Sequence, residues 1–289
     1  MDIPESVLGL FPDPCARVLR SMETSDPVEE LRCRVGRSVS VCDGNRMRDT
    51  GTPVMTAEEL DRILERAANA SLYAHGEELR RGFLHTVDGC RIGVCGTYYQ
   101  NGTSAGIRQI TSLSIRIARE IRGCADVVFS QMRGEPIRHT LILSPPGCGK
   151  TTLLRDLIRR ISDSGVRVSV ADERGELAGA HDRMQGFDLG RNTDVMSGGC
   201  KRDTAMMLLR AMNPQVLAFD EITSREDLEV IREASGCGAA LIATAHARDR
   251  ASLRERALYR DLLNEGIFEQ AIWIRQNGPH RSYSLEQLR

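Results

Sequence analysis

The sequence predicts an α/β protein in which a mostly parallel sheet, covered by helices on both faces, follows a smaller α+β domain. From residue 125 onward, short apolar runs alternate with segments of helical periodicity, the pattern of parallel strands joined by crossover helices. The residues before this point instead combine one clear helix with a hairpin and separate strand-like runs. The length of 289 residues also exceeds that of one typical domain. We therefore expect an N-terminal domain at 1–124 and a larger domain at 125–289.

The clearest element of the N-terminal domain is a helix from Ala57 to about Tyr73. Thr56 and Glu59 have capping-box spacing, and apolar residues follow them at helical spacing. The strands expected in this domain are the second half of Val28–Val41, the runs Gly82–Val87 and Arg91–Tyr98 joined as a hairpin at Asp88-Gly89, and Ser112–Arg116. A helix and turn at Gly123–Arg138 lead into the larger domain.

The larger domain shows the alternation of strands and helices most clearly. The expected strands are Thr140–Leu143, Arg167–Ala171, Val216–Phe219 and Ala239–Thr244. The expected helices are Lys150–Ser162, Lys201–Met212, Ser224–Ser235 and Asp249–Leu263, and a terminal hairpin is expected from Phe268–Arg275 and Arg281–Leu285 around Asn277-Gly278-Pro279. The segment Leu177–Gly199 is rich in Gly and Asp without periodicity, so we expect it to be a loop.

The composition limits the classes of function. Apolar residues make up 41% of the chain and charged residues 27%, as in soluble globular proteins. The net charge of −1 gives no overall electrostatic case for binding nucleic acid or an anionic membrane. The first residues, MDIPESVLGLFPDP, lack the basic start and apolar core of a signal peptide, and no run approaches the ~18 apolar residues that span a bilayer. We expect a cytoplasmic protein with no transmembrane segment of its own.

The nine cysteines do not form a metal site in this interpretation. No two of them have CxxC spacing, and their scatter through apolar and loop positions is typical of reduced thiols that pack as small hydrophobic groups. The sequence therefore predicts no zinc site.

A phosphate-binding loop is the most specific motif of the chain. His139–Thr152 reads HTLILSPPGCGKTT: an apolar strand, a Gly-rich turn, a lysine and two hydroxyls that open a helix. In this layout the backbone N–H groups and the helix dipole face the phosphates, Lys150 reaches the β- and γ-phosphates, and the Thr151 hydroxyl ligates Mg²⁺. The residues expected to line the nucleotide are Ser144, Pro145, Pro146, Gly147, Cys148, Gly149, Lys150, Thr151 and Thr152. The alternative is a Gly/Pro turn before an ordinary helix.

Two details bear on this loop. Ser144 stands where the motif has its first glycine, and it fits there if its φ is negative. Of the 39 Lys and Arg residues, only Lys150 and Lys201 are lysines. A compact ammonium therefore occurs where the loop needs one, in a chain that otherwise uses arginine. From these observations we expect the protein to bind a nucleoside triphosphate.

Hydrolysis needs a carboxylate beside the metal and a group that orients water. The segment PQVLAFDE, residues 214–221, is an apolar strand that delivers two acids at its carboxyl end, where an open α/β sheet places its ligand. We expect Asp220 to hold Mg²⁺ and Glu221 to polarise the attacking water. The alternative is that both acids cap the helix that begins near Ser224.

Two further strands end in residues that suit the same site. Asp172 and Glu173 follow one strand and His246 follows another. Because the carboxyl ends of parallel strands converge, the acids are candidates to support the Mg²⁺ shell and His246 to sense the γ-phosphate. Turn acids and a solvent-exposed histidine are the alternatives.

Seven segments together carry a family resemblance. They are VEELRCRVGRSVSV (28–41), GCRIGVCGT (89–97), SLSIRIARE (112–120), SPPGCGKTTLLRDLIRRIS (144–162), DERGELAG (172–179), TDVMSGGCKRDTAMMLLRAMNPQVLAFDEI (193–222) and TAHA (244–247). They resemble the stage III sporulation protein AA group, relatives of the type II and type IV secretion ATPases. The resemblance implies a RecA-like ATPase core, a homo-hexameric ring, and a cytoplasmic motor recruited to the membrane-embedded channel components of a specialised secretion complex. In endospore formers that complex links the mother cell to the forespore.

The resemblance also implies that arginines of the N-terminal domain or of a neighbouring subunit complete the nucleotide site. A cation there neutralises charge that develops on the γ-phosphate. We expect Arg116 and Arg91 first. Further candidates are Arg108, Arg119, Arg174 and Arg191. Gly198-Gly199 departs from the acid-plus-glycine pair that the family pattern has before residue 200.

The sequence thus predicts an ATPase that uses ATP and Mg²⁺ to power a secretion complex. A nucleic-acid-dependent RecA-like ATPase, such as a helicase, is the second reading; near-neutral charge and one tryptophan disfavour it, because single-strand binders combine a positive groove with aromatic platforms. A regulatory module that binds ATP without turnover is the third, and Glu221 disfavours it, since a pure binding site needs no water-orienting carboxylate.

Overall fold

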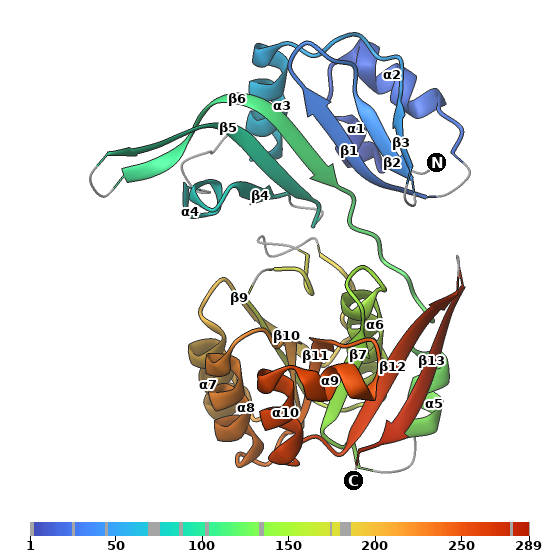
Figure 1. The fold of residues 1–289 in the computed structure, drawn as a ribbon, viewed down its shortest axis with the longest axis vertical. Helices are drawn as coiled ribbons and strands as arrows, with labels where there is room; N and C mark the ends of the chain where they lie inside the picture. The colour runs from blue at the N-terminus through green and yellow to red at the C-terminus, as the bar shows by residue number, and fades with distance from the viewer. Residues whose placement is uncertain are drawn as a thin grey trace. The chain divides into compact units, whose positions relative to one another are not determined.

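The computed structural model describes residues 3–24, 27–43, 46–68, 76–86, 89–101, 104–132, 136–173, 175–179, 186–277 and 280–288. The chain divides into two compact units (Figure 1). Unit 1 comprises residues 1–119 with 179–186, and unit 2 comprises 120–178 with 187–289.

Unit 1 is built on a six-stranded antiparallel sheet with the order β3-β2-β1-β6-β5-β4. The strands are β1 (Val28–Arg34), β2 (Ser40–Asp43), β3 (Arg46–Asp49), β4 (Phe83–His85), β5 (Arg91–Asn101) and β6 (Ser104–Arg116). The helices are α1 (Glu5–Leu8), α2 (Asp13–Ser21), α3 (Ala57–Ala67) and α4 (Gly76–Arg80). The sheet gives this unit one apolar core and one polar face.

The alternation along β1 shows how the two faces arise. Leu31 and Cys33 are fully buried, whereas Arg32 and Arg34 point to the other face. The helix α3 covers the apolar side: its Thr56 side chain caps the N-terminus in a complete capping box with Glu59, and its apolar stripe is buried.

A glycine shapes the long β5–β6 hairpin. The register shifts between Cys95 and Thr97, and a Cβ on the intervening Gly96 would lie 2.7 Å from the Arg108 carbonyl oxygen. Only glycine allows this close approach of the two backbones.

Unit 2 is built on a seven-stranded sheet with the order β13-β12-β7-β11-β10-β8-β9. All neighbours pair in parallel except the terminal hairpin β12–β13. Its strands are β7 (Thr140–Ser144), β8 (Val168–Asp172), β9 (Thr193–Ser197), β10 (Val216–Glu221), β11 (Ala240–His246), β12 (Gln270–Asn277) and β13 (His280–Gln287). Its helices are α5 (Asp126–Met132), α6 (Lys150–Asp163), α7 (Lys201–Met212), α8 (Arg225–Ser235), α9 (Arg250–Glu255) and α10 (Ala257–Asn264).

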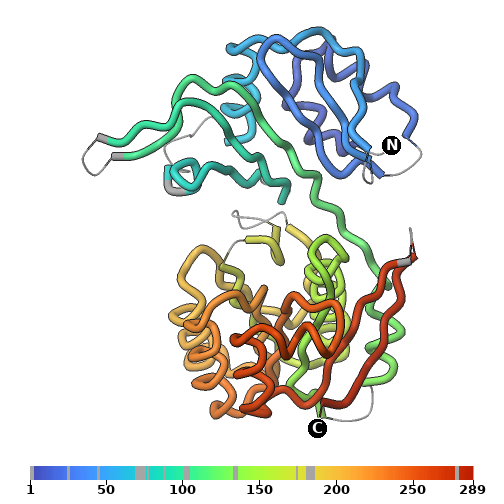
Figure 2. Tube along the Cα trace, viewed as in Figure 1, coloured from blue at the N-terminus to red at the C-terminus, as the bar shows by residue number. Residues whose placement is uncertain are grey.

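Helices cover both faces of this sheet, which produces two cores. Leu141 and Leu143 of β7 pack on the face covered by α7, α8, α9 and α10, whereas Ile142 packs on the face covered by α5 and α6. Strands β7 and β8 are buried along their whole length and are mostly apolar, although β8 also buries Ser169 and Asp172. Figure 2 shows α5, in green, beside the terminal hairpin, in red, where Phe129 joins the core that Tyr283 and Leu285 contact.

The helices α1, α2 and α4 and the strand β3 were not predicted from the sequence, and three other segments differ from their predicted structure. The segment expected as a loop contains β9, which pairs with β8; its half-exposed edge position carries no apolar run that the sequence could show. The single helix expected at Asp249–Leu263 is two helices, because Arg256 has an extended backbone (φ −82°, ψ 123°). The strand expected in the second half of Val28–Val41 corresponds to β2, whereas β1 lies in the first half, where no strand was expected.

Other sequence expectations fall partly outside the described residues. The helix that begins at Ala57 ends at Ala67 with Ala68 as its C-cap, before the predicted end near Tyr73, and residues 69–75 lie outside the described part. The hairpin residues Asp88 and Gly278-Pro279 also lie outside, although the strands on either side pair as expected.

Candidate active site

The phosphate loop has the predicted strand–loop–helix layout. β7 ends at Ser144, and α6 begins at Lys150 with Gly149 as its N-cap. Gly147 (φ 76°) and Gly149 (φ 90°) are both left-handed, a backbone conformation that side chains strain, so the turn requires glycine at these positions. The strand end and the helix start thus enclose a glycine turn suited to phosphate oxygens.

Ser144 fits without strain in place of the motif's first glycine. Among the described residues, the non-glycine residues with positive φ are Gln109 and Asn213, so the φ of Ser144 is not positive. Its side chain is buried and donates a hydrogen bond to the Pro145 carbonyl oxygen at 2.9 Å. The condition that the sequence set for this substitution is met.

Three predicted site residues form a chain of close contacts at the carboxyl edge of the sheet. Lys150 Nζ lies 2.6 Å from Nδ1 of His246, and Nε2 of His246 lies 2.6 Å from Oε1 of Glu221. Lys150 comes from the start of α6, Glu221 from the end of β10 and His246 from the end of β11. The parallel sheet therefore brings together residues that are up to 96 positions apart.

The electrostatics of this chain favour a neutral imidazole. Burial lowers the pKa of His246, and the positive charge of Lys150 lowers it further, although Glu221 opposes the change. A neutral ring accepts from the Lys150 ammonium at Nδ1 and donates its Nε2 proton to Glu221. Burial also lowers the pKa of Lys150, again opposed by Glu221. His246 thus separates the loop lysine from the carboxylate that is expected to act on water.

Asp220 immediately precedes Glu221 in β10 and is 5% exposed. Its negative charge opposes the lowering of the Lys150 pKa that burial causes. Asp220 and the partly exposed Thr151 remain the residues suited to Mg²⁺: a carboxylate and a hydroxyl leave room for phosphate and water ligands. Within the described ranges, no group of three or more His, Cys, Asp or Glu side chains has the geometry to hold a metal.

The other two acids predicted for the metal, Asp172 and Glu173, have contacts elsewhere. Asp172 is fully buried, and its Oδ2 accepts hydrogen bonds from the backbone N–H groups of Leu177 (3.1 Å) and Ala178 (2.8 Å). Burial raises the pKa of this carboxyl. Glu173 points to Lys201, 3.8 Å away. Neither carboxylate lies in the Lys150–His246–Glu221 chain, because Asp172 binds the loop after β8 and Glu173 faces Lys201 of α7.

A buried cluster around Lys201 is the main feature that the site analysis from sequence missed. Lys201 is 7% exposed, and its Nζ donates to the Glu221 carbonyl oxygen at 2.7 Å and to Oδ1 of Asp227 at 2.9 Å. Oδ2 of Asp227 accepts from the backbone N–H groups of Thr223 (2.7 Å) and Ser224 (3.1 Å). The rarity of lysine in this chain is the signal that could have drawn attention to Lys201.

A tyrosine links the ends of two strands at the same edge. The buried Tyr259 hydroxyl donates to the Ile222 carbonyl oxygen at 3.2 Å and accepts from the His246 backbone N–H at 3.3 Å. A hollow of about 300 Å³ opens beside the phosphate loop. Its lining consists of Pro145, Pro146, His246, Ala247, Arg248, Ser252, Glu255 and Arg256.

The two arginines expected first to complete the site lie opposite each other in unit 1. Arg91 of β5 and Arg116 of β6 are direct partners across the sheet. They line a hollow of about 330 Å³ on the polar sheet face, together with Arg32 and Arg34 of β1. The guanidinium of Arg91 stacks over the Phe83 ring at 4.3 Å. This face therefore gathers four arginines, and Glu30 pairs with one of them, Arg32.

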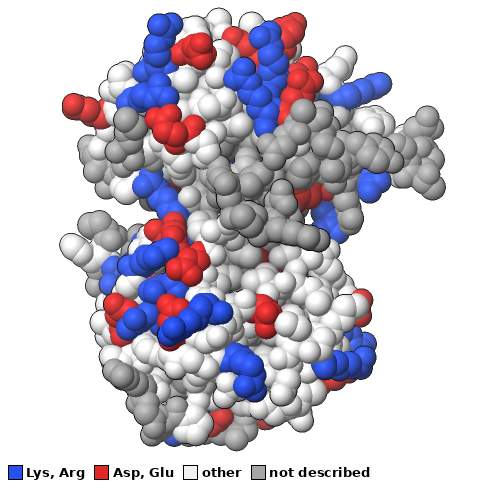
Figure 3. All heavy atoms as spheres, turned by 180° about the vertical axis from the view of Figure 1, so that it is seen from behind, with Lys and Arg blue, Asp and Glu red and all other residues white. Residues whose placement is uncertain are grey.

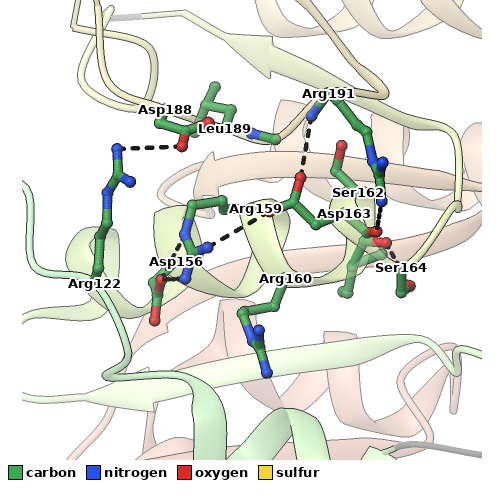
Figure 4. Close-up of polar contacts among 12 residues, drawn as sticks. Arg122, Asp156, Arg159, Arg160, Ser162, Asp163, Ser164, Asp188, Leu189 and Arg191 are labelled. Atoms are coloured by element: carbon green, nitrogen blue, oxygen red, sulfur yellow. Dashed lines mark hydrogen bonds and ion pairs between the residues drawn. The ribbon is translucent and has the colours of Figure 1, made fainter.

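The remaining arginine candidates have separate surroundings. Arg108 is exposed on β6, and Arg119 donates to the Val28 carbonyl oxygen at 2.9 Å. Arg174 lies outside the described residues. Arg191 is not at the phosphate loop: it donates to the Asp163 carbonyl oxygen at 2.7 Å, at the far end of α6 (Figure 4). Thirteen helical residues separate that end from the start of α6, about 20 Å at 1.5 Å per residue.

No helix in the described part of the chain combines the length and the apolar character needed to cross a bilayer.

Comparison with known families places the sequence motifs in context. The model of a family described as Sporulation stage III, protein AA matches residues 5–283. The chain is also 35% identical over 265 residues to Stage III sporulation protein AA of Bacillus subtilis (strain 168), a match that covers 87% of this chain and 84% of that protein. The family resemblance predicted from the motifs is confirmed.

Solved structures of related fold support the architecture. The chain is similar to the pilus retraction motor PilT with bound ADP (TM-score 0.60, 15% identity, 94% of this chain and 82% of that one). It is also similar to the ATPase DotB of Legionella pneumophila (TM-score 0.58, 14% identity, 89% of this chain and 75% of that one). At these identities the similarity shows the fold, and it confirms the predicted RecA-like α/β class.

Proposed function

The chain belongs to the sporulation stage III protein AA family, and from this membership we propose that it is an ATPase that hydrolyses ATP to ADP and phosphate. The observation that carries the proposal is the contact chain from Lys150 through His246 to Glu221 at the carboxyl ends of parallel strands. A phosphate-binding lysine and a carboxylate held beside it are the two groups that binding and water activation require.

The binding half of the site follows from the phosphate loop. Backbone N–H groups of the glycine turn and of the start of α6 suit the phosphate oxygens, and the positive end of the α6 dipole favours their charge. When ATP binds, the Lys150 ammonium exchanges the imidazole of His246 for phosphate oxygens, which are stronger acceptors. Thr151 and Asp220 would hold Mg²⁺, which neutralises phosphate charge.

The hydrolytic half depends on Glu221. Its carboxylate accepts a hydrogen bond from the Nε2–H of His246, which orients one carboxylate oxygen and leaves the other for a water molecule. Once Lys150 turns to the phosphates, one of the causes that lower the pKa of His246 is removed. A proton taken up from solvent at Nδ1 would then let the ring donate a hydrogen bond to a γ-phosphate oxygen. Glu221 then accepts a proton from the attacking water.

We further propose that the protein forms a homo-hexameric ring in the cytoplasm and that hydrolysis makes this ring a motor. The ring is recruited to the membrane-embedded components of a sporulation secretion complex. The support is the family membership together with the fold shared with the pilus motor. Arg91 and Arg116 are proposed to supply a cation for turnover. Figure 3 shows a face on which arginines and acids are interspersed, which is unlike a continuous track for a nucleic acid.

Steady-state hydrolysis of ATP, with and without single- and double-stranded DNA, tests this proposal, and Glu221→Gln serves as the blank. We expect turnover that is indifferent to DNA and rises with protein concentration as subunits assemble. Many-fold stimulation by DNA would replace the secretion motor with a nucleic-acid motor. Turnover no higher than that of the blank, across all protein concentrations, would contradict the assignment of an ATPase.

A further inference from the structure

We propose that Lys201 is a positioning residue for hydrolysis: it fixes the main chain at Glu221 so that the carboxylate faces the phosphate loop. This inference rests on the proposed ATPase activity and deepens it. Lys201 itself touches neither the phosphate loop nor the Glu221 carboxylate in its described contacts.

Lys201 places a positive charge in the protein interior. A buried ammonium is expensive unless it is paired and hydrogen-bonded. Lys201 meets this requirement with Asp227 at 2.9 Å, which is itself 6% exposed, and with the Glu221 carbonyl oxygen at 2.7 Å. One charge pair and one strong hydrogen bond to the backbone are therefore buried together.

The backbone group that Lys201 holds is the carbonyl oxygen of Glu221, the last residue of β10. Holding this oxygen fixes the peptide plane between Glu221 and Ile222, and this plane sets the direction of the Glu221 side chain. The Tyr259 hydroxyl holds the next carbonyl oxygen, that of Ile222, at 3.2 Å.

Asp227 binds both Lys201 and the main chain. One oxygen of its carboxylate binds Lys201, and the other accepts from the backbone N–H groups of Thr223 and Ser224. Although burial raises the pKa of Asp227, the hydrogen bond from Thr223 and the ion pair with Lys201 outweigh it and lower the pKa overall. Lys201 and Asp227 thus form a clasp around residues 221–224.

The two lysines of the chain consequently act on opposite parts of one residue. Lys150 reaches the Glu221 carboxylate through His246, and Lys201 binds the Glu221 carbonyl oxygen directly. Arginine suits the second position poorly, because its planar fork is larger than the compact ammonium that donates there to the Glu221 carbonyl oxygen and to Oδ1 of Asp227, with Glu173 3.8 Å away. An interaction that only orients a catalytic group affects turnover more than substrate binding.

The test compares Lys201→Met with Arg202→Met, a matched control on the exposed neighbour whose ion pair is with Glu233. For Lys201→Met we expect kcat to fall at least 30-fold, while the Kd for a fluorescent ATP analogue changes less than threefold. Lys201→Arg, which keeps the charge, is expected to retain more turnover than Lys201→Met. In the Glu221→Gln background, Lys201→Met is expected to cause no further loss, because it acts through Glu221.

A second readout needs no activity. Displacing the Glu221 carboxylate removes its opposing effect on His246, so the pKa of His246 should drop in Lys201→Met, as in Glu221→Gln. NMR titration of the ring, assigned with His246→Asn, measures this shift in the folded protein without nucleotide. An unchanged kcat, or a further loss in the Glu221→Gln background, would overturn the inference. If the wild-type protein fails to hydrolyse ATP, the proposed function fails, and an unchanged His246 titration in Lys201→Met would separately overturn the role of Lys201.

Discussion

The sheets of the two units use their residues in opposite ways. In unit 2, the central strands are buried on both faces, and polar chemistry appears only where strands end, at Asp220, Glu221 and His246. In unit 1, strand β1 buries one side only, and the polar chemistry lies along the open face of the sheet, where Arg91 and Arg116 pair across it.

This difference shows how sheet type decides where function can lie. A parallel sheet needs helices on both faces, so a ligand binds at the carboxyl ends of its strands. An antiparallel sheet covered on one side exposes a whole face, which here gathers four arginines around a hollow. Five measurements can test this difference between chemistry at the strand ends of unit 2 and charge on the sheet face of unit 1.

The largest expected effect is the loss of ATP binding on Lys150→Ala. Removal of the buried ammonium leaves the phosphates without their main cation, a loss of about 2–5 kcal/mol that weakens binding roughly 30-fold or more. Calorimetric titration with ATP measures it. Arg160→Ala, on a partly exposed flank of the same helix, is the control and should bind normally. Normal affinity in Lys150→Ala would remove the phosphate loop from the site.

Glu221→Gln should separate binding from turnover. The amide keeps the size of the side chain but cannot accept a proton from water, so kcat should fall about 10²- to 10⁴-fold while ATP still binds. Rapid-quench measurement of phosphate formation gives the rate of hydrolysis, and the ATP titration measures binding. Tight ATP retention with normal turnover would contradict the role assigned to this carboxylate.

Arg91→Ala and Arg116→Ala test whether the sheet face of unit 1 contributes to turnover. If these arginines supply the cation, kcat should fall about 10-fold or more in each variant, because charge on the γ-phosphate is no longer neutralised. Steady-state rates at saturating ATP provide the measurement. Arg17→Ala, exposed on α2 of the same unit, is the control. Full activity in both sheet-face variants would confine the chemistry to unit 2.

The separation of the cores should appear in stability. Leu60→Ala in α3 and Leu157→Ala in α6 each delete a fully buried side chain and should cost about 2–5 kcal/mol. Because the two leucines belong to different cores, each substitution should lower the unfolding temperature of its own unit in calorimetric scans. An equal shift of a single transition by both variants would mean that the units unfold as one.

The smallest expected effect is a pH dependence of stability from His246. Its pKa is lowered in the folded protein by burial and by Lys150, whereas the unfolded chain binds the proton near pH 6.5. The contribution to the free energy of unfolding is therefore present above about pH 6.5 and is lost as the pH falls through the folded pKa. Urea unfolding between about pH 8 and 5 should show a steeper decline for the wild type than for His246→Asn. Parallel curves would contradict this account.

The sequence predicted unit 2 well because its signals are local. Helix α7 was predicted with its observed bounds, since Lys201–Met212 has helical periodicity and is followed by Asn213-Pro214. The Lys150 and Glu221 positions followed from strand-end motifs, and the structure brings both to one contact chain through His246. Their roles in binding and hydrolysis stay predictions.

What the sequence could not provide depends on long-range packing. Edge strand β9 has no apolar run, so its pairing with β8 left no periodic signal. The turn of Asp172 toward the N–H groups of Leu177 and Ala178 depends on the fold of the loop after β8. The Lys201–Asp227 pair joins two helices 26 residues apart, and spacing along the chain does not reveal such a contact.

The central claim is that the strand ends of unit 2 hydrolyse ATP. The most direct test is a comparison of single-turnover hydrolysis of radiolabelled ATP by the wild-type protein and by Glu221→Gln, with enzyme in excess so that product release does not limit the rate. The account predicts conversion to ADP by the wild type and ATP that is bound but intact in the variant. Equal rates in the two proteins, or no conversion by an assembled and ATP-bound wild type, would contradict it.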